Sequence, residues 1–103
     1  MLKNQDNHSK RSLDIHGAFV RRTDLSGASL RNANMAGADA TNAIFRNADF
    51  AGAILSGTIL RGADLTGARN LSLEQLSDAI IDEHTILPGY IDRAKLLDAA
   101  VRK

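Results

Sequence analysis

Two kinds of side chain in this sequence could do acid–base or metal chemistry: a spaced series of aspartates and three histidines. The aspartates are Asp14, Asp24, Asp39, Asp49 and Asp64, and the histidines are His8, His16 and His84. Glycoside hydrolysis needs two carboxylates in one cleft, and a metal site needs further ligands at short spacing from a histidine. Because we find no such ligand set, we expect ordinary surface histidines. We interpret the aspartates as a solvated face.

The sequence also lacks the motifs of the commoner catalytic and phosphate-binding sites. None of the serines lies in a nucleophile elbow or has a histidine placed as its base. No glycine is followed by the Lys-Ser or Lys-Thr pair of a phosphate-binding loop. Cysteine is absent, which excludes disulfides and thiolate metal sites. We therefore predict no enzyme activity, no catalytic residues, no cofactor and no metal.

The aspartate spacing belongs to a longer pattern, a period of five residues over 13–67. This range divides into eleven units without an insertion. The third residue of each unit, its centre, is apolar throughout: Ile15, Val20, Leu25, Leu30, Met35, Ala40, Phe45, Phe50, Leu55, Leu60 and Leu65. The first residue is Ala in eight units, and the fifth is Gly or Asn in ten, with Arg22 as the exception. Such a pattern is specific enough to predict an architecture.

A period of five fits neither an α-helix nor a continuous strand, but it fits a short extended segment followed by a corner. In an extended segment, residues two apart share a face, so the first and third residues of each unit point the same way. These are the two apolar or small columns, and we expect them to face inward. Gly and Asn best tolerate the backbone of a corner, which explains the fifth column. Each unit then forms one side of a prism.

The units resemble those of the pentapeptide-repeat family, whose pattern is A-(D/N)-L-x-(G/N). Two clear examples are TDLSG at 23–27 and ADLTG at 63–67. The resemblance implies an all-β solenoid with a helical C-terminal cap, in which the repeats form a right-handed quadrilateral parallel β-helix with four units per coil. Sheet spacing would then make the rod about three coils tall. The four-sided closure is implied by the family, whereas the period is visible in the residues.

Four units per coil would stack residues twenty apart, which explains the one small centre, Ala40. The same coil holds Met35, Phe45 and Phe50, so a small side chain makes room for two large ones at normal packing density. The last column of centres reaches the polar Asn70, and we expect the repeat to end there.

The chain therefore divides into a flexible lead-in at 1–12, a β-helix at 13–71 and a helical cap at 72–103. A stack of coils without a cap would leave an apolar end and unpaired strand edges exposed to water. The segment that follows the repeats also resembles the tail that often follows them in the family. Both observations favour a cap at the C-terminal end.

Two helices are expected in this cap. The first spans 73–83, because Ser72 and Gln75 have the spacing of a capping box and an apolar face can cover the last coil. That face comprises Leu73, Leu76, Ala79 and Ile80. The second spans 90–102, and its apolar side comprises Ile91, Ala94, Leu97 and Val101, widened by Leu96 and Ala100. It either packs back on the rod, the interpretation we favour, or presents this side to a partner.

The second column should be polar, yet it carries Phe19, Ile44, Ile54 and Ile59. Phe19 and Ile59 would share one face, with an aspartate between them and arginines beside them. Exposed apolar side chains next to arginines are typical of protein interfaces. We therefore predict an interaction face that comprises Phe19, Arg21, Arg22, Asp39, Ile54, Ile59 and Arg61. The alternatives are that β-branched residues merely favour strands or that the terminal segments cover this face.

Charge and composition narrow the function further. The repeats carry five aspartates and five arginines, and the whole chain has a formal net charge of +1. Such a balance does not favour direct nucleic-acid binding. No apolar run is long enough for a membrane span, and the first residues lack the apolar core of a secretory signal. We expect a cytoplasmic protein without membrane contact.

We expect a non-enzymatic scaffold that binds a protein partner, with a homodimer through an end or the C-terminal helix as a further option. The resemblance implies an alternative, because some family members mimic B-form DNA and modulate gyrase, a type II topoisomerase. Mimicry requires a strongly acidic surface in place of phosphates. The balanced charge of the repeats opposes it.

Overall fold

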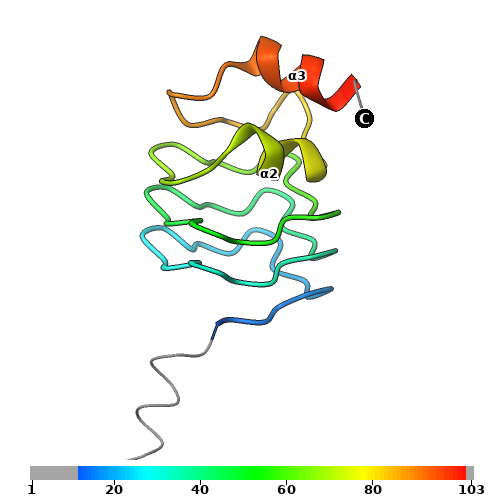
Figure 1. The fold of residues 1–103 in the computed structure, drawn as a ribbon. Helices are drawn as coiled ribbons and strands as arrows, with labels where there is room; N and C mark the ends of the chain where they lie inside the picture. Colours follow the sequence, from blue (N-terminus) through cyan, green and yellow to red (C-terminus); the bar gives the residue numbers. More distant parts are fainter. Residues whose placement is uncertain (1–11, 102–103) are drawn as a thin grey trace, which may run out of the picture.

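The computed structural model describes residues 12–101, which form a solenoid with two helices at one end (Figure 1). The chain winds upward from residue 12, and α2 (Leu73–Asp78) and α3 (Arg93–Val101) lie at the opposite end. The expected lead-in lies outside the described residues except for Ser12, as do His8 and the last residue of the second expected helix. Within the described part, no helix combines the length and apolarity needed to cross a membrane.

Parallel backbone bridges join successive turns of the solenoid at the second residue of each unit. Within the repeats, these bridges connect residues twenty apart, such as Asp14 and Asn34. Two hydrogen bonds accompany that bridge: the Asn34 amide donates to the Leu13 carbonyl (2.8 Å), and the Ile15 amide donates to the Asn34 carbonyl (2.9 Å). Four units therefore make one turn, which is the stacking that we expected.

The corners show why Gly and Asn fill the fifth column. Among the described residues, the fifth residue of every unit has a φ between 57° and 73°, in the left-handed region. Glycine adopts this region freely and asparagine tolerates it. Arg22 adopts it too, with a φ of 57°. Neighbouring hydrogen bonds hold this corner, because the Arg22 amide donates to the Thr41 carbonyl (3.0 Å) and the Thr23 amide to the Val20 carbonyl (3.3 Å).

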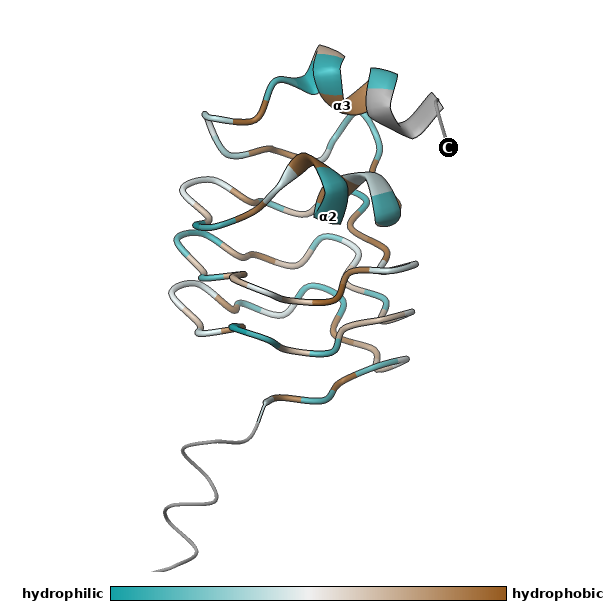
Figure 2. Ribbon diagram, in the orientation of Figure 1, coloured by the Kyte–Doolittle hydropathy of each residue, from teal (hydrophilic) through white to brown (hydrophobic). Residues whose placement is uncertain are grey.

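The first and third residues of the units face inward and form the core, so apolar residues recur along every turn (Figure 2). Met35, Ala40, Phe45 and Phe50 are fully buried. The two phenyl rings lie with their centroids 5.4 Å apart and their planes tilted by 59°. Ala40 thus accompanies the two largest core side chains in one turn. A buried polar residue of the first column, Thr58, satisfies its hydroxyl by donating to a backbone carbonyl of the turn below, at 2.7 Å.

The first cap helix begins where the sequence predicted but is shorter, since α2 ends at Asp78 rather than at residue 83. Its capping box is present: Ser72 Oγ accepts from the Gln75 amide (3.0 Å), and Gln75 Oε1 accepts from the Ser72 amide (2.8 Å). We expected Asn70 to be the last residue of an inward-facing column, and this prediction is wrong. This residue is an exposed left-handed corner with a φ of 62°, and Leu71 takes the buried position.

Beyond α2 the chain returns to the solenoid, which the sequence did not predict. Ile80 forms a bridge with Ile59, and Ile86 forms one with Asp64, at spacings of 21 and 22 residues rather than twenty. The backbone is already extended at Ala79. The assignment of Ala79 and Ile80 to the inner face of a helix was therefore wrong, and Ile80 is 38% exposed.

The second cap helix, α3, begins at Arg93 rather than at residue 90, and it packs back on the protein through Leu96, one of the two residues expected to widen its apolar side. It contacts α2, and Leu96 is buried in the core whereas Leu97 is 56% exposed. The predicted stripe through Leu97 was therefore wrong. Tyr90 ties the start of this segment to the rod, because its hydroxyl donates to the Ala68 carbonyl (2.6 Å) and accepts from the Leu71 amide (3.1 Å).

Candidate functional site

The aspartates of the second column bind the backbone of their own corners. Asp24 Oδ1 accepts hydrogen bonds from the Ser26 amide (3.0 Å) and hydroxyl (2.6 Å). Asp39 Oδ1 does the same with the Thr41 amide (3.1 Å) and hydroxyl (2.6 Å). This arrangement is an Asx turn, in which a short acidic side chain stabilises the bend two residues later. The aspartates are therefore structural braces. The expected solvated face is only partly correct, because Asp14 and Asp24 are exposed whereas Asp49 is buried.

Arginines of the fourth column pair with aspartates of the next turn. The pairs are Arg21 with Asp39 at 3.7 Å, Arg31 with Asp49 at 3.1 Å and Arg46 with Asp64 at 3.0 Å. In each pair the arginine precedes the aspartate by eighteen residues, so a single spacing generates all three. Pairs that involve exposed side chains contribute only about 0.2–1 kcal/mol each, but together they neutralise much of the outward charge of the repeats.

Hydrogen bonding also keeps these carboxyls ionised. Asp49 is the extreme case, because the Asn70 side-chain amide, the Ala51 backbone amide and Arg31 lower its pKa to about 2. The Asn70 Nδ2 atom donates to Asp49 Oδ1 at 2.9 Å. Hydrogen bonds from their own corners likewise lower the pKa of Asp14, Asp24 and Asp39. A general acid needs a pKa raised toward the working pH, so these shifts run against acid catalysis.

The histidines within the described part of the chain lie at the surface beside one acid each. His16 Nδ1 is 2.6 Å from Asp14 Oδ1, and this hydrogen bond raises the pKa of His16. His84 Nε2 is 3.6 Å from Glu83 Oε2. Among residues 12–101, no group of three or more His, Cys, Asp or Glu side chains is arranged to hold a metal ion.

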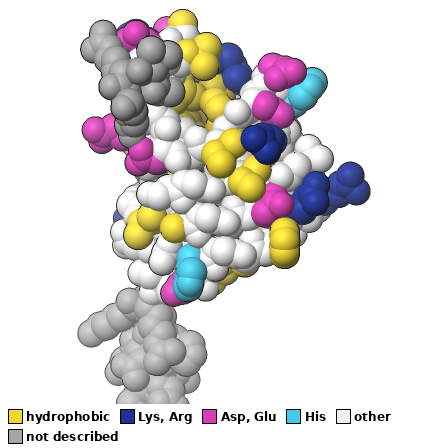
Figure 3. Space-filling view, turned by 90° about the vertical axis from the view of Figure 1, so that its right-hand side faces the viewer, with side chains coloured by type: hydrophobic (Ala, Val, Ile, Leu, Met, Phe, Trp, Pro, Cys, Tyr) yellow, Lys and Arg dark blue, Asp and Glu magenta, His cyan; other side chains and the backbone are white. Residues whose placement is uncertain are grey.

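The residues of the expected interaction face centre on one column of outward side chains: Phe19, Asp39, Ile59 and Ile80. Bridges join these four residues in that order, so they lie one above another on one side of the rod. Phe19 is 81% exposed, whereas Ile59 is half-buried. The exposed arginines of the same units are Arg21, Arg22 and Arg61. We call this column with its arginines the Phe19 face. Figure 3 shows one side of the molecule, on which exposed hydrophobic side chains are interspersed with basic and acidic ones.

The Phe19 face carries more positive than negative charge. Arg21 is held by Asp39. Within residues 12–101, no carboxylate lies within ion-pair distance of Arg22 or Arg61. The pKa of Asp39 is lowered chiefly by the hydroxyl of Thr41, and the nearby arginines act in the same direction. The Phe19 face therefore combines apolar side chains with two cations, Arg22 and Arg61, that form no ion pair with a described carboxylate, although Arg61 lies near enough to Asp39 to lower its pKa.

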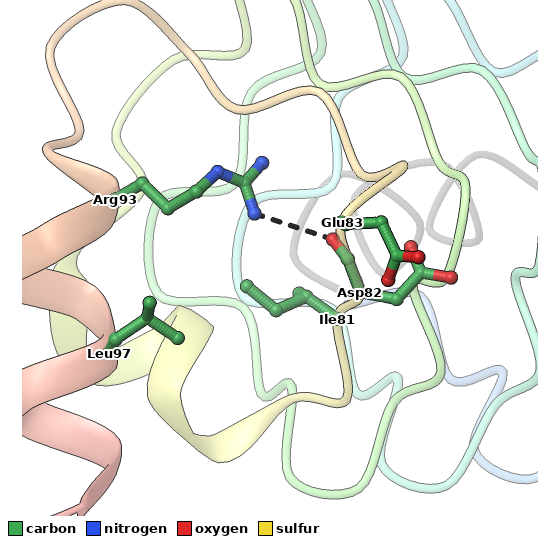
Figure 4. A pocket seen from close by; sticks show the side chains of 5 residues that line it. All are labelled: Ile81, Asp82, Glu83, Arg93 and Leu97. Atoms are coloured by element: carbon green, nitrogen blue, oxygen red, sulfur yellow. Dashed lines mark hydrogen bonds between the residues drawn. The ribbon is translucent and has the colours of Figure 1, made fainter.

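A groove lies between α3 and the segment that follows α2 (Figure 4), and this segment begins directly after Ile80, the last residue of the Phe19 column. The groove has a volume of about 280 Å³ and is lined by Ile81, Asp82, Glu83, Arg93 and Leu97. A neighbouring hollow of about 320 Å³ shares Ile81 and Leu97 and includes Ile80. Arg93 directs its guanidinium at the cap, where Nη1 donates to the Asp82 carbonyl (3.3 Å). Sequence reasoning missed both hollows because it placed residues 79–83 inside a helix.

The other apolar residues of the second column lie on different sides of the rod. Bridges place Ile54 in the column that starts at Asp14, and Ile44 in the column that starts at Asp24. Ile54 is 47% exposed, and Ile44 is half-buried. Ile54 therefore borders the Phe19 face on the neighbouring side, in the same turn as Ile59, and is not part of its column.

Five-residue sides, left-handed corners and turns of twenty residues define the class of protein as a β-solenoid. A family model described as pentapeptide repeats matches residues 13–47 and 43–80, with eight copies of the repeat. The chain therefore belongs to the pentapeptide-repeat family. The sequence resemblance is confirmed.

Solved structures of similar proteins include a pentapeptide repeat protein from the cyanobacterium Cyanothece 51142, with 32% identity over 75% of this chain and 52% of that chain and a TM-score of 0.65. One from the thylakoid lumen of Arabidopsis thaliana has 30% identity over 80% of this chain and 63% of that one, with a TM-score of 0.49. QnrB1, a plasmid-mediated fluoroquinolone resistance protein, has 20% identity over 87% of this chain and 44% of that one, with a TM-score of 0.47. This chain thus spans 52% and 63% of the first two structures. A comparison with curated protein sequences finds no match.

Proposed function

We propose that this protein is a non-enzymatic scaffold that binds another protein through the Phe19 face. The observation that carries the proposal is Phe19 itself, an aromatic side chain that is 81% exposed and lies in one column with Ile59 and Ile80. Aromatic and arginine side chains contribute most of the binding energy at many protein interfaces. We take the scaffold to be the right-handed quadrilateral β-helix of about three coils that the family resemblance implies.

The chemistry of the Phe19 face indicates the kind of partner. Apolar side chains of the partner would cover Phe19, Ile59 and Ile80, and carboxylates of the partner would bind the arginines. Arg22 and Arg61 are the two cations of the face that form no ion pair with a carboxylate among the described residues. Arginine binds carboxylates through two parallel hydrogen bonds, which adds specificity. We therefore expect a partner surface that is apolar at its centre and acidic at its rim.

The three arginine–aspartate pairs between successive turns, which we call the arginine–aspartate ladder, oppose the alternative of a DNA mimic that modulates gyrase. A mimic must present unbalanced negative charge in place of phosphates. Here Asp39, Asp49 and Asp64 each have an arginine within ion-pair distance. The same ladder leaves the Phe19 face positive rather than negative.

Paired variants test the proposal by quantitative affinity purification with mass spectrometry. Phe19→Asp places an aspartate beneath Asp39, and the control Ser29→Asp places one beneath Asp49. Both residues are the second of their five-residue unit, and both belong to the first turn. Two units separate the variants, so they lie on opposite sides of the rod. We expect Phe19→Asp to reduce the captured partner by about tenfold or more, as loss of a central interface residue does, and Ser29→Asp to retain it. Equal retention by both variants would exclude the Phe19 face.

A further inference from the structure

The two ends of the rod are covered to different degrees. Beneath the cap, the last three centres are nearly inaccessible to water: Leu55, Leu60 and Leu65. At the end near residue 12, three centres of the first turn are only partly buried: Ile15, Val20 and Leu25. Leu13 at the same end is 47% exposed. Within the described part of the chain, the first turn therefore presents an apolar end to its surroundings.

The backbone of the first turn has an edge that pairs with none of residues 12–101. In higher turns the second residue of a unit bonds to the turn below through both its amide and its carbonyl, as Asn34 does with Leu13 and Ile15. The equivalent residues of the first turn are Asp14, Phe19, Asp24 and Ser29. Within residues 12–101, neither the amide nor the carbonyl of any of these four residues forms a hydrogen bond. Unpaired strand edges are templates for pairing with another chain.

We propose that a second copy of this chain covers this end, turned over so that the two first turns meet. The amide and the carbonyl of an extended residue point to the same side, so each of the four residues offers one donor and one acceptor. A two-fold axis makes the facing segments antiparallel, and in that arrangement two opposed residues exchange both hydrogen bonds. A single strand of another protein would pair with one side of the rod, whereas an identical four-sided end can pair with all four.

The size of the end is compatible with a reversible dimer. The whole molecule, cap included, spans 26 × 24 Å along its two shorter axes, so each copy would bury at most about 600 Å², and the pair about 1,200 Å², which is the lower limit for specific interfaces. The contact uses the backbone and the end of the core. Outward side chains such as Phe19 and Ile59 remain on the side of the rod, so the dimer does not depend on the proposed function.

Sedimentation equilibrium and amide hydrogen exchange of the full chain test the dimer together. We expect the mass to rise toward that of two chains as the protein concentration increases. Over the same range of concentration, the amides of Asp14, Phe19, Asp24 and Ser29 should exchange more slowly. The Ile80 amide, which donates to the Thr58 carbonyl at 2.8 Å, should be protected at every concentration. A monomer at all concentrations would overturn the proposal, and so would protection of the four amides in a monomer.

Two matched pairs of variants locate the contact. Leu13→Lys adds a charge to the apolar end of each copy and should weaken the dimer by about tenfold or more, because an unpaired charge is costly to bury in an apolar contact. Leu97→Lys places the same charge at a similarly exposed leucine of the other end and should leave the dimer intact. Ser29→Pro removes one of the unpaired amides, whereas Ser29→Ala keeps it, so only the proline variant should weaken association. The reverse order in either pair would contradict this contact.

Discussion

At the scale of single residues, the corners determine which side chains the fold accepts. Three asparagines lie directly beneath a glycine of the next turn: Asn32 beneath Gly52, Asn42 beneath Gly62 and Asn47 beneath Gly67. A Cβ atom on any of these glycines would meet the Oδ1 atom of the asparagine below. Glycine is therefore favoured there, because it adopts the left-handed backbone without strain and leaves space for the asparagine side chain below.

Arg22 is the corner residue least suited to its backbone, so Arg22→Gly should stabilise the protein. Its φ is 57°, and a left-handed conformation costs a residue with a Cβ atom about 1–2 kcal/mol. Glycine avoids that cost but loses about 0.4–1 kcal/mol through the greater freedom of the unfolded chain. We expect a net gain of about 0.5–1 kcal/mol, visible as a higher urea midpoint. A lower midpoint would show that Arg22 makes a stabilising contact that outweighs the strain.

Acid should destabilise the protein partly through Asp49. Its pKa is about 2 in the folded chain against the ordinary 3.8, so the unfolded chain binds a proton more readily as the pH falls. The contribution is present in full above about pH 4 and is lost as the pH falls toward 2. Urea midpoints measured across this window should decline, and they should decline less steeply in Asp49→Asn. An equal slope in the variant would contradict this role of Asp49.

At the scale of elements, Gln75 connects the cap to the solenoid. The same side chain completes the capping box through Oε1 and donates from Nε2 to the carbonyls of Phe50 (2.9 Å) and Ala53 (3.0 Å). The start of α2 and the corner of the turn below it are thus held by one residue. The buried Leu76 completes the contact between this helix and the core.

Gln75→Glu should detach this corner while preserving the shape of the side chain. A carboxylate still accepts from Ser72 but cannot donate to the two carbonyls, and partly buried acceptors without donors cost about 1–3 kcal/mol. Thermal or urea unfolding of Gln75→Glu should show this loss. The neighbouring exposed change Glu74→Gln serves as the control and should cost less, about 0.3–1 kcal/mol, because it removes only a negative charge from the first turn of α2. A Gln75→Glu variant as stable as the control would contradict the claim that Gln75 holds α2 on the solenoid.

Ala40 tests the packing of the turn that holds the two phenylalanines. Ala40 is fully buried, so Ala40→Leu should overpack this layer and destabilise the protein by about 1–3 kcal/mol. Ala36→Leu, in the outward fourth column of the same turn, should change stability by less than about 0.5 kcal/mol. The two urea midpoints provide the comparison. An unchanged midpoint for Ala40→Leu would mean that the turn has spare volume.

The repeats could be predicted from the sequence because one period sets the inward columns, the corners and the stacking. The cap could be predicted only in part. Ser72 marked the start of α2, but the apolar residues after Asp78 fit a helix as well as an extended segment. Ile80 and Ile86 rejoin the solenoid at spacings of 21 and 22 residues, and such insertions remove the periodic signal. The column of Phe19 was therefore visible from the sequence, while its upper end and the adjoining groove were not.

At the scale of the whole molecule, the sides and the ends of the rod serve different purposes. The inward columns and corners repeat with little variation, so they account for the fold. The departures from the pattern lie on the surface, where the Phe19 face combines exposed apolar side chains with Arg22 and Arg61. One end is covered by α2 and α3, and the first turn at the other end has an unpaired backbone edge among the described residues. Partner binding through a side and self-association through an end can therefore coexist.

Site-specific photo-crosslinking tests the central claim most directly. A photoreactive amino acid would replace Phe19 in one variant and Ser29 in another, since both residues are exposed, occupy the second column of the same turn and lie on opposite sides of the rod. We predict that position 19 labels a partner other than the chain itself and that position 29 does not. Equal labelling from both positions, or labelling from position 29 alone, would contradict the assignment of the Phe19 face.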